Sequence, residues 1–136
     1  MIELSEQIVL SSSEQAKHII DQLKSLDITI SIANFSGSYE SLRYLRKMTI
    51  DQVKINCEQL VSTNDNHADK AIINALITLA RSMNLPLIGT QIHKQESAAA
   101  FAAMGGKLIQ GNIISSGVAL NELDTWLEKW QDQKRQ

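Results

Sequence analysis

The sequence predicts an α/β domain in which parallel strands alternate with helices. Five short apolar segments of strand length recur along the 136 residues, and each is followed by a segment with helical periodicity. Strict alternation of this kind implies parallel strands joined by right-handed crossovers. An open doubly wound sheet and part of a (β/α)8 barrel both fit this order. Because a whole barrel takes about 250 residues, this chain could supply little more than half of one.

Each predicted strand is short and dominated by aliphatic or β-branched residues. Such runs are typical of strands that are buried in a parallel sheet. Pro86 is tolerable because it stands at the start of its segment. The five segments are "IEL" (2–4), "ITISI" (28–32), "QVKI" (52–55), "LPLIG" (85–89) and "KLIQG" (107–111).

Helices are predicted between and after these strands from apolar residues that recur every three or four positions. Ser11 and Glu14 have the spacing of a capping box at the start of the first helix, and Gly105 and Gly106 end a helix that begins near residue 95. The strongest period lies in residues 67–83. The predicted inward residues are Ala16, Ile19, Ile20, Leu23 and Leu26, then Leu42 and Leu45, then Ala68, Ile72, Ala75, Leu76, Leu79 and Met83, and finally Leu120, Leu123, Leu127 and Trp130.

Composition excludes several classes of function. The apolar content of 43% can form a core, but the net charge of −2 argues against a nucleic-acid-binding surface and against a polybasic membrane anchor. No apolar run approaches the roughly 20 residues of a membrane helix. Cys57 is the single cysteine, so an internal disulfide is excluded and a reducing, cytoplasmic location is expected. Contacts with nucleic acid or membrane are therefore not expected.

In either parallel architecture, ligands bind at the C-terminal ends of the strands. Glu3 interrupts the first apolar strand, where a carboxylate is costly unless it is paired, binds a metal or faces water at an edge. Lys54 interrupts the third strand. A lysine there could serve a phosphate or a metal-bound water, although a side chain that reaches solvent from the strand end is the favoured expectation.

The other reactive residues do not assemble a recognisable site. His93 follows a strand but has no second His or Cys at ligand spacing, and His18 and His67 are expected in solvent. Cys57 is expected to be a small buried residue. The glycines form neither a P-loop nor a dinucleotide fingerprint, and Trp126 and Trp130 are expected to pack on a helix. The residues alone therefore predict no nucleophile–base pair, metal cluster or phosphate loop.

The order of the strand ends nevertheless resembles the C-terminal part of the EAL-domain family, the cyclic-di-GMP phosphodiesterases built on a (β/α)8 barrel. "IELSE" is similar to the family's E-[LI]-T-E, and "IANFSGSYESLRYLRKMTIDQVKIN" to its DDFGTGYSSLxYLxxLPxDxLKID. "LPLIGTQIHKQES" and "MGGKLIQGNIISSGV" stand where the family has AEGVETxEQ and LGCDxxQGYxFSxPL. The resemblance implies that residues 1–136 form the C-terminal portion of an EAL-like domain, about its last five β/α units, with the strands that carry the EAL signature absent.

The departures from the family motifs bear on activity. The family holds divalent metals with carboxylates and activates a water for attack on a phosphodiester. Its tandem aspartates fall on Ala33 and Asn34, the aspartate of its KID on Asn56, and the glutamates of its AEGVE on Thr90 and His93. Since one carboxylate and an amide do not hold a metal pair, no catalytic residue, no metal and no cofactor is expected. The residues retained as a vestigial ligand site are Glu3, Asn34, Lys54 and Gln110.

Nucleotide binding is also disfavoured, though less strongly than hydrolysis. The family's Arg-Pro after the last strand is replaced by Ser116-Gly117, and the tyrosine of its QGY by Asn112. The resemblance then implies a degenerate, catalytically inactive regulatory domain that acts by protein contacts in bacterial cyclic-di-GMP signalling. A non-hydrolysing sensor of cyclic-di-GMP or another nucleotide is the alternative. The expected partners are another protein, the missing half of a longer chain, or a second copy in a homodimer, because a partial barrel exposes strand edges.

Overall fold

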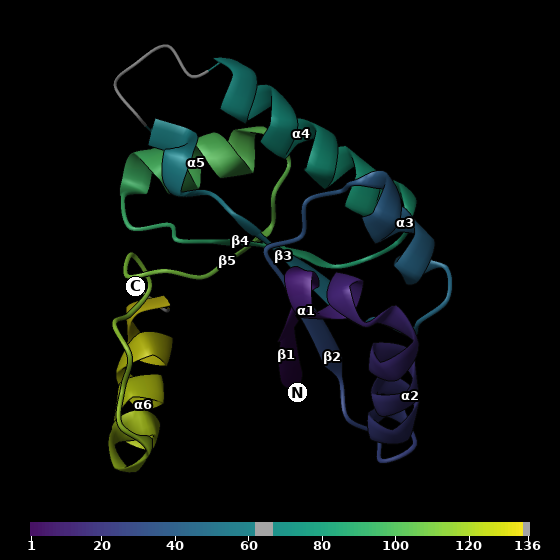
Figure 1. Ribbon diagram of the computed structural model, residues 1–136. Coiled ribbons are helices and arrows are strands. Elements are labelled where there is room, and N and C mark those ends of the chain that lie inside the picture. The colour runs from purple at the N-terminus through teal and green to yellow at the C-terminus, as the bar shows by residue number, and fades with distance from the viewer. Residues whose placement is uncertain (62–66, 135–136) are drawn as a thin grey trace.

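The computed structural model describes residues 1–61 and 67–134. Its sheet has five parallel strands in the order β1-β2-β3-β4-β5, which is also their order along the chain (Figure 1). A sheet wound in one direction with right-handed crossovers carries its helices on one face, as a (β/α)8 barrel does. This order confirms the partial barrel over the doubly wound sheet. The strands are β1 Ile2–Ser5, β2 Ile30–Ala33, β3 Gln52–Asn56, β4 Leu87–Thr90 and β5 Leu108–Ile109.

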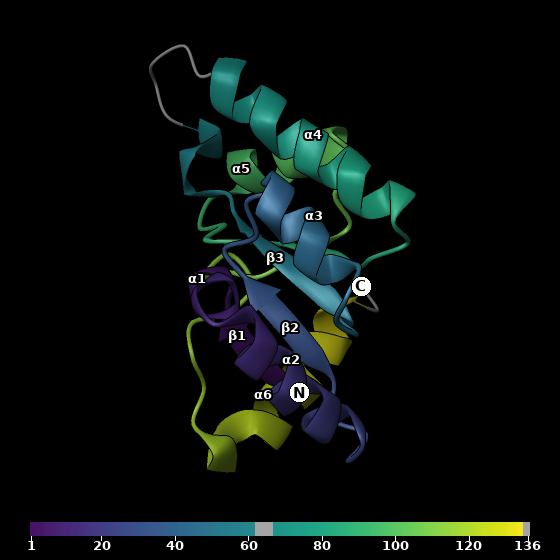
Figure 2. The same ribbon diagram turned by 45° about the vertical axis from the view of Figure 1, so that its right-hand side comes forward.

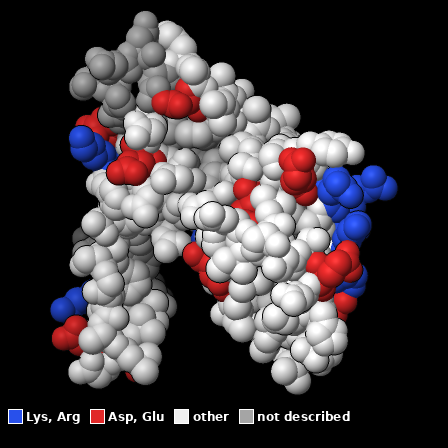
Figure 3. Space-filling view, in the orientation of Figure 1, with Lys and Arg blue, Asp and Glu red and all other residues white. Residues whose placement is uncertain are grey.

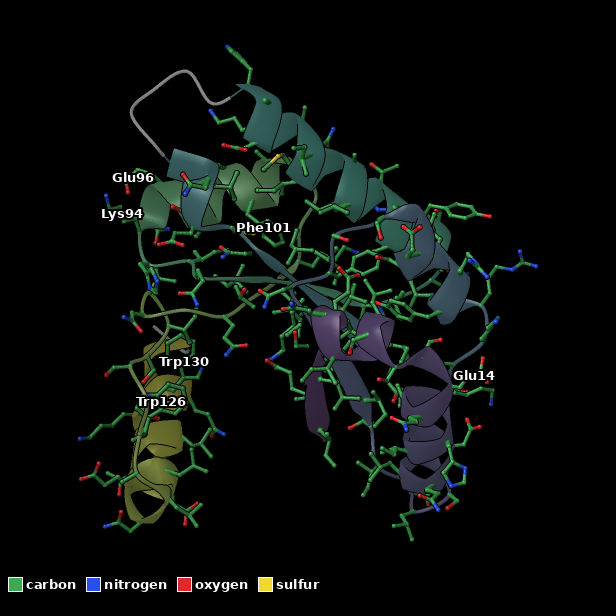
Figure 4. The ribbon with its side chains drawn as sticks, in the orientation of Figure 1. Glu14, Lys94, Glu96, Phe101, Trp126 and Trp130 are labelled. Atoms are coloured by element: carbon green, nitrogen blue, oxygen red, sulfur yellow. The ribbon has the colours of Figure 1, made fainter. Side chains whose placement is uncertain are left out.

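Helices follow every strand, and α3, α4 and α5 lie side by side over the sheet (Figures 1 and 2). In contrast, α6 stands apart from β1 and β2, and its Trp126 and Trp130 rings stack on each other with centroids 5.4 Å apart (Figure 4). The helices are α1 Glu6–Ser11, α2 Ser13–Lys24, α3 Tyr39–Leu45, α4 His67–Ser82, α5 Gln95–Ala103 and α6 Leu123–Lys134, with 3-10 turns at Glu58–Val61 and Leu120–Glu122. None of the helices within these described residues is long and apolar enough to cross a membrane.

The two faces of the sheet differ in chemistry. Side chains alternate along each strand, so the residues of one face recur at every second position. The helix-covered face is fully apolar and forms the core with the helices, from Ile30 and Ile32 of β2 and Val53 and Ile55 of β3. The register places Glu3 beside Ser31 and Lys54 beside Ile88 on the opposite face. In a barrel, that opposite face lines the interior.

A carboxylate fixes the start of β2. Asp51 accepts two hydrogen bonds of 2.8 Å from Lys24 Nζ and one of 2.6 Å from the backbone N–H of Ile30. Partial burial works to raise the pKa of Asp51, but these hydrogen bonds and the Lys24 charge lower the pKa on balance. The contact joins α2, β2 and the segment before β3 at the N-terminal end of the sheet.

Several predicted helix details are wrong. Ser11 ends α1 instead of capping the next helix, and its hydroxyl donates to the carbonyl of Ile8. In α2 only Ile20 is fully buried, whereas Ile19 is exposed, as is Leu26 beyond the end of the helix. In α4 the buried residues are Ile73, Leu76, Ile77 and Ala80, so of the predicted inward set only Leu76 is buried and Leu79 packs half-buried against the core. The reason is that α4 has apolar residues on two faces, and periodicity does not say which face meets the sheet.

Candidate functional site

Side chains from three alternate strands meet on the face of the sheet that the helices leave open. Lys54 of β3 forms an ion pair with Glu3 of β1 and donates a hydrogen bond of 2.9 Å to Oε1 of Gln110, which follows β5. Barrel interiors are built in this way, from layers of side chains that alternate strands contribute. The structure therefore brings together three of the four predicted ligand residues.

The ion pair is asymmetric in burial. The Lys54 side chain is 8% exposed, whereas that of Glu3 is 46% exposed. The expectation that Lys54 reaches solvent is wrong, because its ammonium group stays inside and is satisfied by the Glu3 carboxylate and the Gln110 amide. A buried ammonium needs such partners, since desolvation otherwise penalises its charge. Glu3 is accordingly engaged in neutralising a lysine.

A second carboxylate lies three residues further along the chain and is almost completely buried. Glu6, at 5% exposure, accepts hydrogen bonds from the Ser36 backbone N–H at 3.0 Å, the Ser41 hydroxyl at 2.5 Å and the Tyr44 hydroxyl at 3.3 Å. Burial, and then the charge and hydrogen bond of Glu6, raise the pKa of Tyr44. Glu6 thus ties α1 to the β2–α3 connection and to α3. No role for Glu6 was predicted from the sequence.

Asn34, the fourth predicted ligand residue, lies apart from this group. It directly follows β2 with a φ of +56°, a left-handed conformation that asparagine tolerates better than most residues. It lines a pocket of about 330 Å³ together with Asn56, Asp69 and Ile72. The pocket lies between the ends of β2 and β3 and the first turns of α4. Its polar groups are mostly amides, with Asp69 as the carboxylate.

The ends of β4 and β5 are bound to each other. The Asn112 backbone N–H donates to Nδ1 of His93 at 3.4 Å, and Nε2 of His93 lies 3.0 Å from Oε1 of Gln91. Nδ1 therefore accepts while Nε2 carries the proton. Gly111 allows this contact, because a Cβ there would lie 2.0 Å from the carbonyl oxygen of Ile92. Thr90 is also occupied, since its hydroxyl donates to the carbonyl of Ile55 at 3.0 Å.

The donor set at these strand ends does not fit a pair of divalent cations. Such ions require several oxygen ligands with negative charge. Glu3 is paired with Lys54, whose ammonium would repel a cation, and Glu6 is already coordinated by three hydrogen-bond donors. Among residues 1–61 and 67–134, no three His, Cys, Asp or Glu side chains are grouped to hold a metal ion.

Cys57 lies at the end of β3, and as expected it is fully buried. Burial raises the pKa of its thiol to about 12, although a backbone hydrogen bond acts in the opposite direction. A thiol with this pKa carries almost no thiolate at neutral pH, so it does not act as a nucleophile.

The sequence and the fold are both similar to those of one protein family. The family model described as "EAL domain" matches residues 1–116. The chain is 23% identical over 130 residues to the cyclic di-GMP phosphodiesterase NbdA of Pseudomonas aeruginosa, covering 96% of this chain and 17% of NbdA. It is 25% identical over 130 residues to the cyclic di-GMP phosphodiesterase PdeL of Escherichia coli, covering 95% of this chain and 36% of PdeL.

Solved structures agree with the fold. The PaMucR phosphodiesterase in complex with c-di-GMP superposes with a TM-score of 0.78 at 23% identity, covering 89% of this chain and 54% of that one. The EAL domain of Mycobacterium smegmatis DcpA gives a TM-score of 0.78 at 24% identity, covering 93% and 57%. The chain thus spans just over half of these solved chains and a smaller share of the curated relatives.

Proposed function

This chain belongs to the EAL domain family, and from that membership we propose that it is a non-hydrolysing EAL domain that acts through protein contacts in bacterial cyclic-di-GMP signalling. The proposal takes residues 1–136 as the C-terminal portion of the domain. The observation on which it rests is the ion pair between Lys54 of β3 and Glu3 of β1 on the open face of the sheet. The carboxylate that stands in the family's E-[LI]-T-E motif neutralises a buried lysine.

The residues that replace the family's aspartates support the same proposal. Metal-assisted hydrolysis needs cations that hold the phosphate and lower the pKa of the attacking water. The positions aligned with the family's aspartates carry Ala33, Asn34 and Asn56, which supply no negative charge. Without that negative charge, these strands lack the anionic ligands that would bind two cations beside a phosphodiester.

The test is an assay of the purified chain with cyclic-di-GMP and either magnesium or manganese, in which products are separated by chromatography. We expect no linear dinucleotide above a blank without protein, while an active EAL phosphodiesterase assayed in parallel converts the substrate. Metal-dependent formation of the linear product would overturn the proposal. Incubation with EDTA distinguishes such activity from a contaminating metal-independent nuclease.

The second candidate function is a sensor that binds cyclic-di-GMP, or another nucleotide, without hydrolysing it. The observation in its favour is that Glu3, Lys54 and Gln110 converge on the open face of the sheet, while Asn34 lines a separate pocket. Under this proposal these four residues are its vestigial ligand site. Isothermal titration calorimetry with cyclic-di-GMP separates the two functions: saturable heat that Lys54→Met abolishes supports the sensor, and no heat supports the interaction domain.

A further inference from the structure

A pocket of about 420 Å³ lies at the N-terminal ends of β4 and β5 and is here called the β4–β5 pocket. It is bounded by the C-terminal end of α4 and by the two loops that lead into these strands. Most of its wall is apolar, and the Leu108 side chain on this wall is 49% exposed. A pocket of this size and lining is typical of small-molecule sites. Its apolar lining residues are Ile77, Ala80, Leu85, Pro86, Leu87 and Leu108.

Among the described residues that line the β4–β5 pocket, two are cationic and none is acidic. Arg81, in the last turn of α4, donates a hydrogen bond of 3.3 Å to the carbonyl of Gly105. Gly105 has a φ of +88°, and a Cβ there would collide with Nη2 of Arg81, so this glycine admits the guanidinium. That hydrogen bond uses one of the five N–H donors of arginine. Lys107, two residues after Gly105, is exposed, and its ammonium has no ion-pair partner within residues 1–61 and 67–134.

Cations elsewhere on the surface are mixed with carboxylates. On the face shown in Figure 3, the Lys and Arg side chains over α2 and α3 lie among Asp and Glu side chains. The pocket between these two helices is lined by two carboxylates and three cations, which are Glu14, Glu40, Lys17, Arg43 and Lys47. Most of the positive charge there is compensated by its neighbours. The positive charge at the β4–β5 pocket has no such compensation within its lining, so an anionic ligand would supply it.

We propose that the β4–β5 pocket binds a fatty-acid-like anion, a molecule with an unbranched apolar chain and one carboxylate. The chain lies against Leu85, Leu87 and Leu108, which removes apolar surface of both partners from water. The carboxylate lies at Arg81 and Lys107. A guanidinium suits a carboxylate because it offers parallel N–H donors to the two oxygens. An uncharged chain leaves both cations without a counter-ion, and a cationic amphiphile is repelled by them.

The β4–β5 pocket is separate from the residues that the sequence predicts as a ligand site. Those residues are Glu3, Lys54 and Gln110 on the open face of the sheet and Asn34 after β2. Reactions in (β/α)8 barrels take place at the C-terminal ends of the strands, so a ligand at the N-terminal ends of β4 and β5 is an effector and not a substrate. Its binding neither requires nor excludes hydrolysis of cyclic-di-GMP.

The test is isothermal titration calorimetry of the full chain with octanoate, octanol and octyltrimethylammonium, three probes that share one apolar chain and differ in the charge of the headgroup. We expect saturable heat with one octanoate per chain. Octanol and octyltrimethylammonium should bind at least about tenfold more weakly, because they lose the charge-assisted hydrogen bonds of the carboxylate.

Variants locate the binding site. We expect the double variant Arg81→Gln/Lys107→Gln to bind octanoate at least about tenfold more weakly than the natural sequence. The matched control is Arg43→Gln/Lys47→Gln, which removes the same charge from the pocket between α2 and α3 and should bind as the natural sequence does. Lys107→Gln alone changes an exposed residue and should weaken binding about threefold, so the prediction stays testable if the double variant does not fold. Circular dichroism verifies folding.

A second pair of variants tests the apolar wall. Leu108→Glu places a carboxylate where the chain of the ligand lies and should abolish octanoate binding, whereas Ile8→Glu, at a 62% exposed residue of α1, should leave it unchanged. Four results overturn the inference: no saturable heat with octanoate, equal affinity for octanol, unchanged affinity in Lys107→Gln and Leu108→Glu, or an equal loss of affinity in the control variants.

Discussion

Glu3 lies in β1 and Glu6 begins α1 three residues later, and the two carboxylates have contrasting surroundings. Glu3 is half exposed and contacts a buried lysine, while Glu6 is buried and receives hydrogen bonds from three donors on the β2–α3 connection and α3. Glu6 therefore accepts the hydrogen bonds of donors from other parts of the fold, and Glu3 mainly neutralises the charge of Lys54. The difference separates a carboxylate that holds several elements together from one that neutralises a single lysine.

The largest effect is expected for Glu6→Ala. The substitution leaves the Ser36 N–H and the hydroxyls of Ser41 and Tyr44 without their acceptor in a buried space. Unsatisfied buried donors cost about 1–3 kcal/mol each, partly relieved by rotation of the hydroxyls, so we expect the free energy of unfolding to fall by about 3 kcal/mol. Urea unfolding followed by circular dichroism measures it. Glu14→Ala, at an exposed site on α2, is the control with no expected change.

If Glu6→Ala lowers the free energy of unfolding by less than about 1 kcal/mol, Glu6 does not stabilise the fold more than Glu3 does. That result would mean that water or a rearranged loop replaces the carboxylate. Glu6→Gln is then informative, since its amide keeps one acceptor oxygen but presents an N–H₂ group to donors. We expect the free energy of unfolding of Glu6→Gln to lie between those of Glu6→Ala and the natural sequence.

The next effect concerns Glu3 and Lys54, and here the more exposed partner matters more. Glu3→Gln leaves the buried Lys54 ammonium with Gln110 and a second amide, which costs about 1–2 kcal/mol. Lys54→Met removes the buried charge and leaves Glu3 free to be hydrated, so its cost is within about 1 kcal/mol. Chemical denaturation of both variants tests the order. A larger loss for Lys54→Met than for Glu3→Gln would contradict the assignment of Glu3 as the partner that serves the lysine.

The contrast also shows what the sequence could and could not predict. β–α alternation located all five strands, and the alternation of side chains between the two faces explains why Glu3, Lys54 and Gln110 converge on one of them. The role of Glu6 was out of reach because its partners stand 30, 35 and 38 residues away. The inward face of α4 was misassigned because Ile72 and Ile73 belong to two apolar stripes with the same helical period, and only the tertiary packing chooses between them.

The smallest effect is expected for Asp51, a third carboxylate that resembles Glu6 in accepting a backbone hydrogen bond and Glu3 in contacting a lysine. Its pKa is lower when folded than when unfolded, so its stabilising contribution is complete above the unfolded pKa of about 4 and is lost as the pH falls through the folded pKa. Because Asp51 is partly exposed, Asp51→Asn should reduce the free energy of unfolding by only about 1 kcal/mol at pH 7. The gap between the two proteins should narrow as the pH falls below about 4, because the natural carboxylate is then protonated first in the unfolded chain and, at the lower folded pKa, in the folded protein. Unfolding curves collected across this range measure it, with Asp21→Asn as the control, because Asp21 forms an exposed pair within α2. A gap that stays constant to low pH would show that the geometry of Asp51, and not its charge, fixes the start of β2.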